Sequence, residues 1–430
     1  MKKIKYPKKE DWNIMLKRPS QTVDDIEKTV IEIFSEVNTK GDKAVKKYTE
    51  LFDGIVLQSL AVTQDEIDAS VNMIDTGLKE SIQLAKNNIS LFHEAQRTQR
   101  VELNTMEGVS CWQEKRPIQK VGLYIPGGTA PLFSTVLMLA VPAVLAGCEE
   151  IVLCTPPDSE GRINPAILYT AQLCGIKKIY KVGGIQAVAA MTFGTETIPA
   201  VYKIFGPGNQ FVTVAKQLAT KFGVAIDMPA GPSELLVFAD ETANPAFIAS
   251  DLLSQAEHGS DSQVILVTTS EALLDNVLKE IDDQLQLLPR AEIAQNAINN
   301  SKVILVEDSE TALNLINEYG PEHFIVSASD EDFFATNILN AGSVFIGDYT
   351  PESAGDYASG TNHTLPTNGY ARQYSGLNLD SFMKSITFQK ITKAGLKKLG
   401  PAVELMAAAE GLQAHKNAVT LRLKEIIENE

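Results

Sequence analysis

An amide and an imidazole stand together at the end of one predicted helix, at a spacing that could do chemistry. Asn244 and Pro245 suit the cap and the first turn of that helix, and Gly259 suits its C-terminal stop. Gln255 and His258 are three residues apart, so they should share one face of the last turn. Two metal ligands, or two polar contacts to a substrate, could converge there.

A second candidate is an acid that directly precedes a histidine, in a chain with only five histidines. Glu322 and His323 follow Gly320-Pro321 in a loop that leads into a predicted strand. A carboxylate next to an imidazole at a strand edge suits proton transfer near neutral pH. An ordinary surface acid beside a loop histidine is the competing interpretation.

Two further polar groups lie nearer the C-terminus. The predicted loop 347–363 is richer in glycine, acids and hydroxyls than a connection requires, and Asp356 within it could ligate a cation. Glu410 and His415 lie on one predicted helix, five residues apart, so they point in different directions. One possible metal site joins four nitrogen or oxygen donors: Gln255, His258, Asp356 and His415. Such donors suit zinc or manganese, but the spacing alone leaves the presence of a metal open.

Three glycine-rich turns follow predicted strands in the middle of the chain. They span residues 125–131, 182–186 and 205–209. Glycines at such places let the backbone approach a phosphate or a sugar at a helix N-terminus. The chain has no GxGxxG fingerprint, and tight turns of any parallel sheet use glycine, so these turns alone leave a bound NAD open.

The elements that must position these groups alternate between strand and helix from residue 121 onward. This alternation is typical of parallel sheets covered on both faces. The predicted strands form two successive series: 121–125, 151–154, 179–182, 201–205 and 224–226, then 235–238, 264–267, 303–306, 324–326 and 344–346. The predicted fold class is therefore α/β, with two incomplete Rossmann-like parallel-sheet domains and helical extensions at both ends.

Helical periodicity covers the two ends of the chain. Apolar residues recur at helical spacing over 22–100, and helices are also expected at 380–389 and 402–427. We divide the chain into an N-terminal arm, two Rossmann-like domains, the second on the cofactor side, and a C-terminal helical tail that reaches a partner subunit. The boundaries, in that order, are 1–22, then 23–120 with 235–377, then 121–234, and finally 378–430.

Composition argues against several classes of partner and location. The 430-residue chain has a net charge of −16, which disfavours nucleic acid and anionic membranes. The most apolar window, 136–146, is broken by Pro142 and is shorter than the roughly 20 residues of a membrane span, so it should be a buried helix. The basic N-terminus is followed by no apolar run, which argues against a secretory signal and for a cytoplasmic protein.

The motifs match a known family in their order along the chain. The stretch 226–258 consists of Ile-Asp, then Ala-Gly-Pro-Ser-Glu, then a helix that closes on Glu-His. The glycine turns, the loop 320–323, the loop 355–366 and the helix 410–418 match as well, so the likeness covers nearly the whole chain. With these motifs the chain resembles the histidinol dehydrogenases, and no motif position departs from the family's pattern.

The resemblance implies an NAD-dependent, zinc-containing homodimer with shared active sites. Such an enzyme oxidises L-histidinol through L-histidinaldehyde to L-histidine, the last two steps of histidine biosynthesis. The implied ligands of one zinc ion per subunit, the last of them supplied by the partner subunit, are Gln255, His258, Asp356 and His415. The implied substrate contacts are Ser233, Gln255, His258, His323, Asp356, Glu410 and His415. The implied cofactor contacts are Tyr124, Gln186 and Asn209.

The chemistry agrees with the implied roles of Glu322 and His323. Oxidation of an alcohol needs a base for the hydroxyl proton while hydride leaves for the nicotinamide, and His323 would be that base. The aldehyde must then gain water, which Glu322 would activate. Zinc would position the imidazole and the amine of the substrate rather than polarise the reacting oxygen.

Four other interpretations stay open. A related NAD-dependent alcohol dehydrogenase of the same family should lose Glu410 or His415, and both are present. A zinc-dependent hydrolase would need no nucleotide, and a two-domain solute-binding protein would want a signal peptide. An aldehyde dehydrogenase mechanism would need a nucleophilic thiol, of which Cys111 and Cys148 lie near the cofactor unit. The cysteines show no CxxC pairing and are expected to be buried thiols: Cys111, Cys148, Cys154 and Cys174.

Overall fold

The computed structural model describes residues 1–18, 24–127, 130–229 and 231–429. Parts of three features expected from the sequence lie outside the described residues, namely the arm, the first glycine turn and the Ala-Gly-Pro-Ser-Glu motif: 19–22, Gly128, Thr129 and Ala230. The chain forms two compact units. The larger comprises Met1–Gln96 with Ile118–Phe382, and the smaller comprises Arg97–Pro117 with Met383–Glu430.

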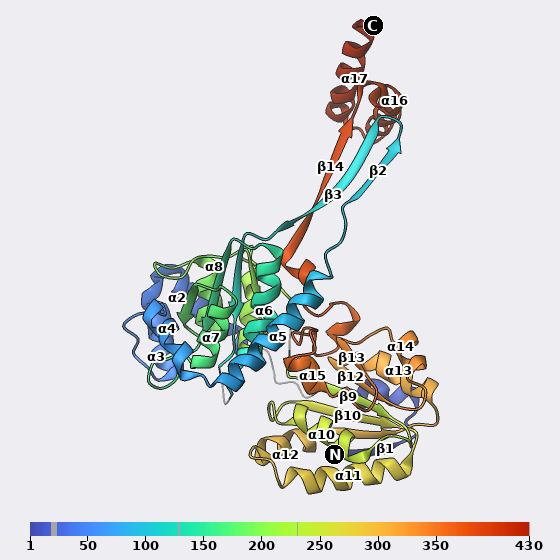
Figure 1. Ribbon diagram of the computed structural model, residues 1–430. Coiled ribbons are helices and arrows are strands. Elements are labelled where there is room, and N and C mark those ends of the chain that lie inside the picture. The colour runs from blue at the N-terminus through green and yellow to red at the C-terminus, as the bar shows by residue number, and fades with distance from the viewer. Residues whose placement is uncertain (19–23, 128–129, 230, 430) are drawn as a thin grey trace. The chain divides into compact units, whose positions relative to one another are not determined.

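The larger unit contains a six-stranded sheet in the order β1-β11-β10-β9-β12-β13 (Figure 1). Every neighbouring pair of its strands is parallel. The strands span Lys2–Lys5 (β1), Glu234–Ala239 (β9), Gln263–Thr268 (β10), Lys302–Leu305 (β11), His323–Ser327 (β12) and Ser343–Ile346 (β13). The second predicted series is thus confirmed. Strand β1 was not predicted, because Ile4 is its one apolar residue.

Both faces of this sheet are covered by helices, and strand β9 shows how its residues alternate between them. Leu235 and Val237 pack in the core beneath α10, α11 and α12, whereas Leu236 and Phe238 pack on the other face with α13 and α14. The helices span Pro245–Ala256 (α10), Glu271–Leu285 (α11), Ala291–Asn299 (α12), Ser309–Tyr319 (α13) and Glu331–Asn337 (α14), and two short elements, Lys9–Asp11 (η1) and Trp12–Met15 (α1), precede them in the chain. Burial on both faces explains the unbroken apolar run of β9.

The larger unit also contains a five-stranded parallel sheet in the order β6-β5-β4-β7-β8. Its strands span Lys120–Tyr124 (β4), Glu150–Thr155 (β5), Lys178–Lys181 (β6), Lys203–Phe205 (β7) and Ala225–Ile226 (β8), which confirms the first predicted series. Its helices span Phe133–Ala146 (α6), Pro165–Leu173 (α7), Gly184–Phe193 (α8) and Gln210–Thr220 (α9). The apolar window 136–146 lies in α6 and is largely buried, as predicted.

The helices that begin the chain pack on those of the five-stranded sheet. Helices α2 and α3 contact α8, α4 contacts α7, and α5 contacts α6. They span Asp24–Lys40 (α2), Asp42–Asp53 (α3), Gln64–Met73 (α4) and Thr76–Glu94 (α5). Within the described ranges, no helix combines the length and the apolar character that crossing a bilayer would require. The domain boundaries given above stay a prediction.

The smaller unit holds a three-stranded antiparallel sheet, β14-β3-β2, and two helices. The strands span Val101–Met106 (β2), Val109–Pro117 (β3) and Met383–Ile391 (β14). The predicted helix 380–389 is wrong: after a short 3-10 turn, Leu379–Phe382 (η3), the alternation of polar and apolar residues over 385–388 has the period of a strand. The predicted helix 402–427 is in fact parts of two, Lys393–Ala409 (α16) and Gln413–Glu428 (α17), because Gly411 with a φ of +74° separates them.

Candidate functional site

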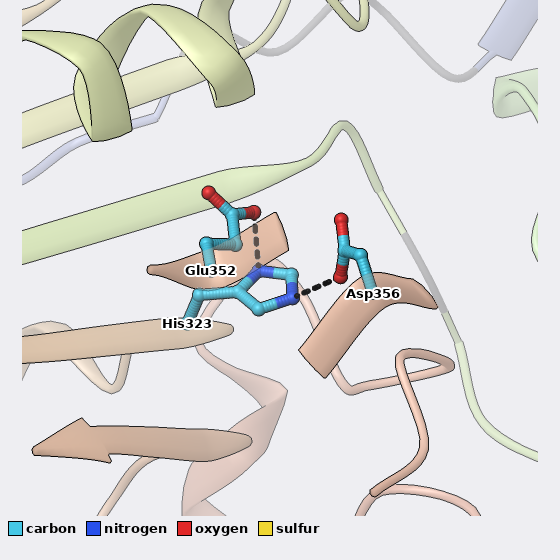
Figure 2. A group of neighbouring side chains, drawn as sticks. All are labelled: His323, Glu352 and Asp356. Carbon is cyan, nitrogen blue, oxygen red and sulfur yellow. Dashed lines mark ion pairs between the residues drawn. The ribbon is translucent and has the colours of Figure 1, made fainter. Parts of the chain in front are cut away.

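His323 is the first residue of β12 and lies between the carboxylates of Glu352 and Asp356 (Figure 2). Helix α13 ends at Tyr319, and Gly320, with a φ of +61°, turns the chain toward the strand. Nδ1 of His323 lies 3.2 Å from the backbone carbonyl oxygen of Glu234. Because a carbonyl only accepts, Nδ1 donates there, and a neutral ring then has its free lone pair on Nε2. Nε2 faces Oδ1 of Asp356 at 3.5 Å.

Two of the acids around His323 come from a short helix, Glu352–Tyr357 (α15), where a loop was expected. Glu352 and Asp356 are four residues apart, so both side chains lie on the helix face that meets the imidazole. Oε1 of Glu352 is 3.4 Å from Nδ1 of His323, and the Glu352 side chain is only 2% exposed. The helix therefore places one carboxylate near each ring nitrogen.

Glu322 is the third acid of the group. Its Oε2 accepts a hydrogen bond from the backbone N–H of Glu234 at 2.8 Å and lies 3.7 Å from Nδ1 of His323. Burial raises the pKa of Glu322 to about 8, although the charge of His323 and the Glu234 N–H act in the opposite direction. The carboxyl group is therefore mostly protonated at neutral pH.

The remaining titratable groups share one coupled environment. Burial would lower the pKa of His323, but the facing carboxylates, Glu352 first, outweigh it and raise that pKa well above the ordinary range. Burial raises the pKa of Glu352, whereas contact with His323 outweighs burial at Asp356 and lowers its pKa. The coupled group thus favours a charged imidazole opposite a charged Asp356.

Gln255 connects the acids to the end of α10. The predicted cap is confirmed, because Asn244 Oδ1 accepts from the N–H of Ala246 and Pro245 opens the helix. In the amide orientation that satisfies both neighbours, Gln255 donates to Glu352 Oε1 at 2.7 Å and accepts from the backbone N–H of Glu234 at 2.9 Å. The Gln255 amide is buried among the groups that surround His323.

Helix α10 ends at Ala256, and His258 lies two residues beyond that end. The helix therefore ends earlier in the chain than predicted. The His258 residue is exposed as a whole. Surrounding protein displaces part of its water and lowers its pKa, while the nearby Asp356 carboxylate acts in the opposite direction. A lowered pKa favours the neutral imidazole that a metal requires.

A fourth histidine fixes the helix that bears Asp356. His363 Nδ1 donates to the backbone carbonyl of Asp356 at 2.8 Å, and its Nε2 lies 3.2 Å from Oγ1 of Thr135 on α6. Burial lowers the pKa of His363, which keeps it neutral. The neutral His363 ring therefore connects the last turn of α15 to Thr135.

The structure brings only part of the predicted site together. Within the larger unit, the imidazole of His323 is surrounded by Gln255, Glu322 and Asp356. Ser233 lies half-buried just before β9. Glu410, the C-cap of α16, and His415, in the first turn of α17, belong to the smaller unit and are exposed.

Two sets of residues could hold a cation near His323. Asp356 Oδ1 is buried without a hydrogen-bond partner in the part of the chain that the structure describes. It belongs to the set predicted from the sequence, and it also belongs to a second set whose donor atoms lie within 4.8 Å of one another: His323, Glu352 and Asp356. Asp356 is the residue common to both.

A cavity of about 990 Å³ opens on the five-stranded sheet, a size at the upper end of the roughly 300–1,000 Å³ of ligand pockets. Its walls include Tyr124, Gln186 and Asn209. The hydroxyl of Tyr124 accepts from the N–H of Gly184 at 3.1 Å, and Asn209 caps α9. Oε1 of Gln186 is buried with no hydrogen-bond partner among the described residues, so a ligand could supply one.

The third glycine turn is held by a buried ion pair. Lys216 and Asp227 are paired, with side chains 3% and 1% exposed. Lys216 Nζ donates to the carbonyl of Gly206 at 2.7 Å, and Asp227 Oδ2 accepts from the backbone N–H of Gly206 at 2.8 Å. Only glycine fits there, because a Cβ would meet the backbone oxygen of Tyr124 at 2.1 Å. The Ile226-Asp227 motif thus fixes a turn that leads to Asn209.

The cysteines are free thiols. Burial raises the pKa of Cys148 and of Cys174 to about 12, and it raises the pKa of Cys154 as well. A nucleophilic thiol needs a lowered pKa, so these three are poorly suited to a thiohemiacetal mechanism. Cys111 lies on β3 of the smaller unit.

Sequence reasoning gave no role to Glu352 or to the side chain of Glu234. Glu352 stands four residues before Asp356, a spacing that becomes informative only once 352–357 is known to be helical. Glu234 opens a strand that is otherwise entirely apolar, and a charged residue in such a place is a usable signal of a buried partner.

Comparisons with known proteins agree with one another along the chain. A family model described as histidinol dehydrogenase matches residues 16–423. The histidinol dehydrogenase of Bacteroides thetaiotaomicron is 60% identical over 426 residues, 99% of this chain and 100% of that protein. That of Haemophilus influenzae is 52% identical over 417 residues, 97% of each.

A solved structure has the same fold. The crystal structure of histidinol dehydrogenase from Elizabethkingia anophelis superposes with a TM-score of 0.97 at 55% identity and covers 99% of this chain and 98% of that one. The chain belongs to the histidinol dehydrogenase family, and it is an oxidoreductase. The resemblance and the α/β fold class predicted from the sequence are both confirmed.

Proposed function

We propose that this member of the histidinol dehydrogenase family oxidises L-histidinol to L-histidine through L-histidinaldehyde, with two NAD in turn as hydride acceptors, and so completes histidine biosynthesis. The observation that supports it best is the buried His323 imidazole with Glu322, Glu352 and Asp356 around it. This group supplies a base, a protonated acid and a fixed anion beside one another, as acid–base chemistry at neutral pH requires.

In the first oxidation, His323 takes the hydroxyl proton of the alcohol at Nε2 while the C–H electron pair leaves as hydride. Nε2 is buried and lacks a hydrogen-bond partner among the described residues, so an alcohol O–H can occupy that position. Nδ1 keeps its bond to the Glu234 carbonyl throughout, which holds the ring in orientation. The products are the aldehyde, one hydride equivalent and one proton.

In the second oxidation, Glu322 in its ionised form takes a proton from water as the water oxygen bonds to the aldehyde carbon, and His323 returns the proton that it took in the first oxidation to the carbonyl oxygen. His323 then takes a hydroxyl proton of the resulting gem-diol while the second hydride leaves, which yields the carboxylic acid. Neither side chain has to move far between the two steps, because Glu322 and His323 are neighbours at the start of β12. The same adjacent pair serves both steps.

The cavity on the five-stranded sheet fits a dinucleotide. Gln186 Oε1, which has no hydrogen-bond partner among the described residues, offers an acceptor, and Gly127 and Gly184 line the cavity. Tyr124, Gln186 and Asn209 would hold NAD, which, when bound, accepts the hydride.

The donor set also fits zinc. His258 is favoured as a neutral imidazole, Asp356 Oδ1 accepts no hydrogen bond from the described residues, and Gln255 lies beside them. When bound, the ion would hold the amine and imidazole of the amino alcohol and offset the charge of Asp356. With that charge offset, the pKa of His323 falls toward the range in which a neutral ring can act as a base.

His415 would complete this ligand set in the site of a second subunit, and Glu410 would contact the substrate there. The smaller unit offers an apolar surface for such a dimer, because Leu405, Met406 and Leu421 are 73%, 67% and 66% exposed on α16 and α17. A homodimer with two shared active sites is the arrangement that follows.

The experiment is the yield of NADH from a limiting amount of L-histidinol. We expect two NADH for each histidinol, and a chelator should suppress both. One NADH for each histidinol would mean that the reaction stops at the aldehyde, and none would refute the proposed function. A His323→Asn variant, with its ring removed at similar volume, should lose turnover yet still bind NAD.

A further inference from the structure

Arg18 follows α1 and packs against the head of β9. Its side chain is 13% exposed, and that of its partner Glu234 is 4% exposed. Nε of Arg18 donates to Oε1 of Glu234, and Nη2 donates to Oε2 at 2.8 Å, a two-point pairing that matches a guanidinium to a carboxylate. The guanidinium also lies 3.9 Å from the ring centroid of Tyr319 and donates to the Tyr319 carbonyl at 2.9 Å.

Glu234 in turn holds both members of the adjacent acid–base pair through its backbone. Its N–H donates to Oε2 of Glu322 at 2.8 Å, and its carbonyl accepts from Nδ1 of His323 at 3.2 Å. Its position therefore sets the position of the carboxyl group and the orientation of the ring together.

A third contact locks the Glu234 carboxylate. The backbone N–H of Asn368 donates to Oε1 at 2.9 Å, and Asn368 has a φ of +54°, uncommon for a residue other than glycine. Such a backbone persists only where its surroundings hold it in place. Oε1 thus accepts from Asn368 as well as from Arg18, and little freedom is left to the side chain.

We propose that Arg18 is a positioning residue for the reaction: it fixes Glu234, and through the Glu234 backbone it fixes the Glu322 carboxyl group and the His323 ring. This inference rests on the proposed function, because Arg18 acts only through those two groups. Arg18 joins the end of α13 to the head of β9, and the loop that leads to Glu322 and His323 starts at that helix end.

The contacts predict that lysine cannot replace Arg18. An ammonium keeps the charge, but it cannot bond both carboxylate oxygens in one plane or stack on the Tyr319 ring. Loss of the cation leaves a buried carboxylate unpaired, and the side chain of Glu234 then moves toward water with its backbone. A displacement of about 1 Å at a reacting group can cost on the order of 100-fold in rate.

The test compares Arg18→Lys and Arg18→Ala with the matched variant Arg372→Lys. Arg372 is 47% exposed and donates to the Gly369 carbonyl in the loop next to Gly320, without touching Glu234. Turnover number, KM for NAD, KM for histidinol and Tm are measured for each protein.

We expect Arg18→Lys to lower kcat roughly 10- to 100-fold while KM for NAD stays within about twofold, and Arg372→Lys to match the parent. Guanidinium ions, added below denaturing concentrations, should restore part of the turnover of Arg18→Ala, because they can occupy the vacated space beside Glu234. A role in folding alone would move Tm and NAD binding together and would give no rescue in folded protein.

The outcomes separate this inference from the proposed function. Full turnover in Arg18→Lys, or a loss of turnover that merely follows Tm and is not rescued, overturns the positioning role while an inactive His323→Asn leaves the proposed function standing. Full turnover in His323→Asn overturns the role of His323 and removes the basis of the positioning role with it, whereas no NADH from histidinol in the parent protein overturns the proposed function. If guanidinium rescues Arg18→Ala, and if the separate variant His323→Asn is inactive, the results support both the positioning role and the proposed function.

Discussion

Replacement of Glu322 by glutamine tests whether a buried, protonated carboxyl group stands beside His323. Glutamine has the same shape and still offers an oxygen to the N–H of Glu234, which Glu322 accepts from at 2.8 Å. It cannot ionise, so it cannot activate water. We expect Glu322→Gln to become more stable than the parent protein as the pH rises, and to lose the aldehyde step more severely than the alcohol step.

The magnitude follows from the two pKa values of Glu322. The folded value is about 8 and the ordinary value is 4.5, so between these pH values the folded protein binds a proton that the unfolded chain has lost. Stability therefore falls as pH rises through this window, and the loss is complete above the folded value. From pH 6 to pH 8 the interval is two pH units at 1.36 kcal/mol each, reduced because half of the folded carboxyl groups are ionised at pH 8, so stability falls by about 2 kcal/mol.

The assay is thermal unfolding of both proteins at a series of pH values from 6 to about 8.5, across the window that linkage defines. The Tm of Glu322→Gln minus that of the parent should increase steadily over this range. Glu318→Gln is the control, because Glu318 is 47% exposed near the same loop and should give a constant difference. A Glu322→Gln difference that does not change with pH would refute the raised pKa and, with it, the idea that Glu322 must lose a proton before it acts.

Four further outcomes are expected. His323→Ala should lower turnover by about 10²- to 10⁴-fold with zinc content unchanged, whereas His415→Ala should lose zinc. Metal analysis checks both variants, and full zinc occupancy in His415→Ala would remove His415 from the ligand set. Mixed His323→Ala and His415→Ala subunits should regain some activity, and no recovery after verified subunit exchange would argue against a shared site. Lys216→Met should raise KM for NAD roughly tenfold with less effect on kcat, because Asp227 loses its partner beside the Gly206 turn; an unchanged KM would limit the pair to a role in stability. Cys148→Ala should keep most of the aldehyde oxidation, and its abolition would favour a thiohemiacetal.

The parallel sheets could be predicted because burial on both faces leaves a strong local signal. Strands such as 235–238 are continuous apolar runs, and their spacing with helices between them gives the layout. Strand β14 was missed because its exposed surface leaves only a weak period of two, which competes with the helical pattern that follows. Strand β1 was missed for a related reason, since three of its four residues are lysines and its pairing with β11 depends on the backbone.

The site could be predicted in part. The adjacency of Glu322 and His323 is visible in the sequence, and so is the spacing of Gln255 and His258. The role of Glu352 depends on a helix of six residues that no local periodicity reveals. Contacts between residues far apart in the chain, such as Nδ1 of His323 with the Glu234 carbonyl, arise only when β9 and β12 pair.

The proposed chemistry makes demands that one imidazole among three acids can meet. Two oxidations of one carbon release two hydride equivalents, and every proton lost by the alcohol, the water and the gem-diol needs an acceptor near the reacting atoms. A lone buried histidine would have its pKa lowered by burial and could accept few of them. The negative charges of the facing carboxylates, Glu352 first, reverse that shift, while burial raises the pKa of Glu322 and of Glu352. The charge of the group can then change by one proton at a time. The same residues would therefore serve the oxidation of the alcohol and that of the aldehyde without a rearrangement of the fold.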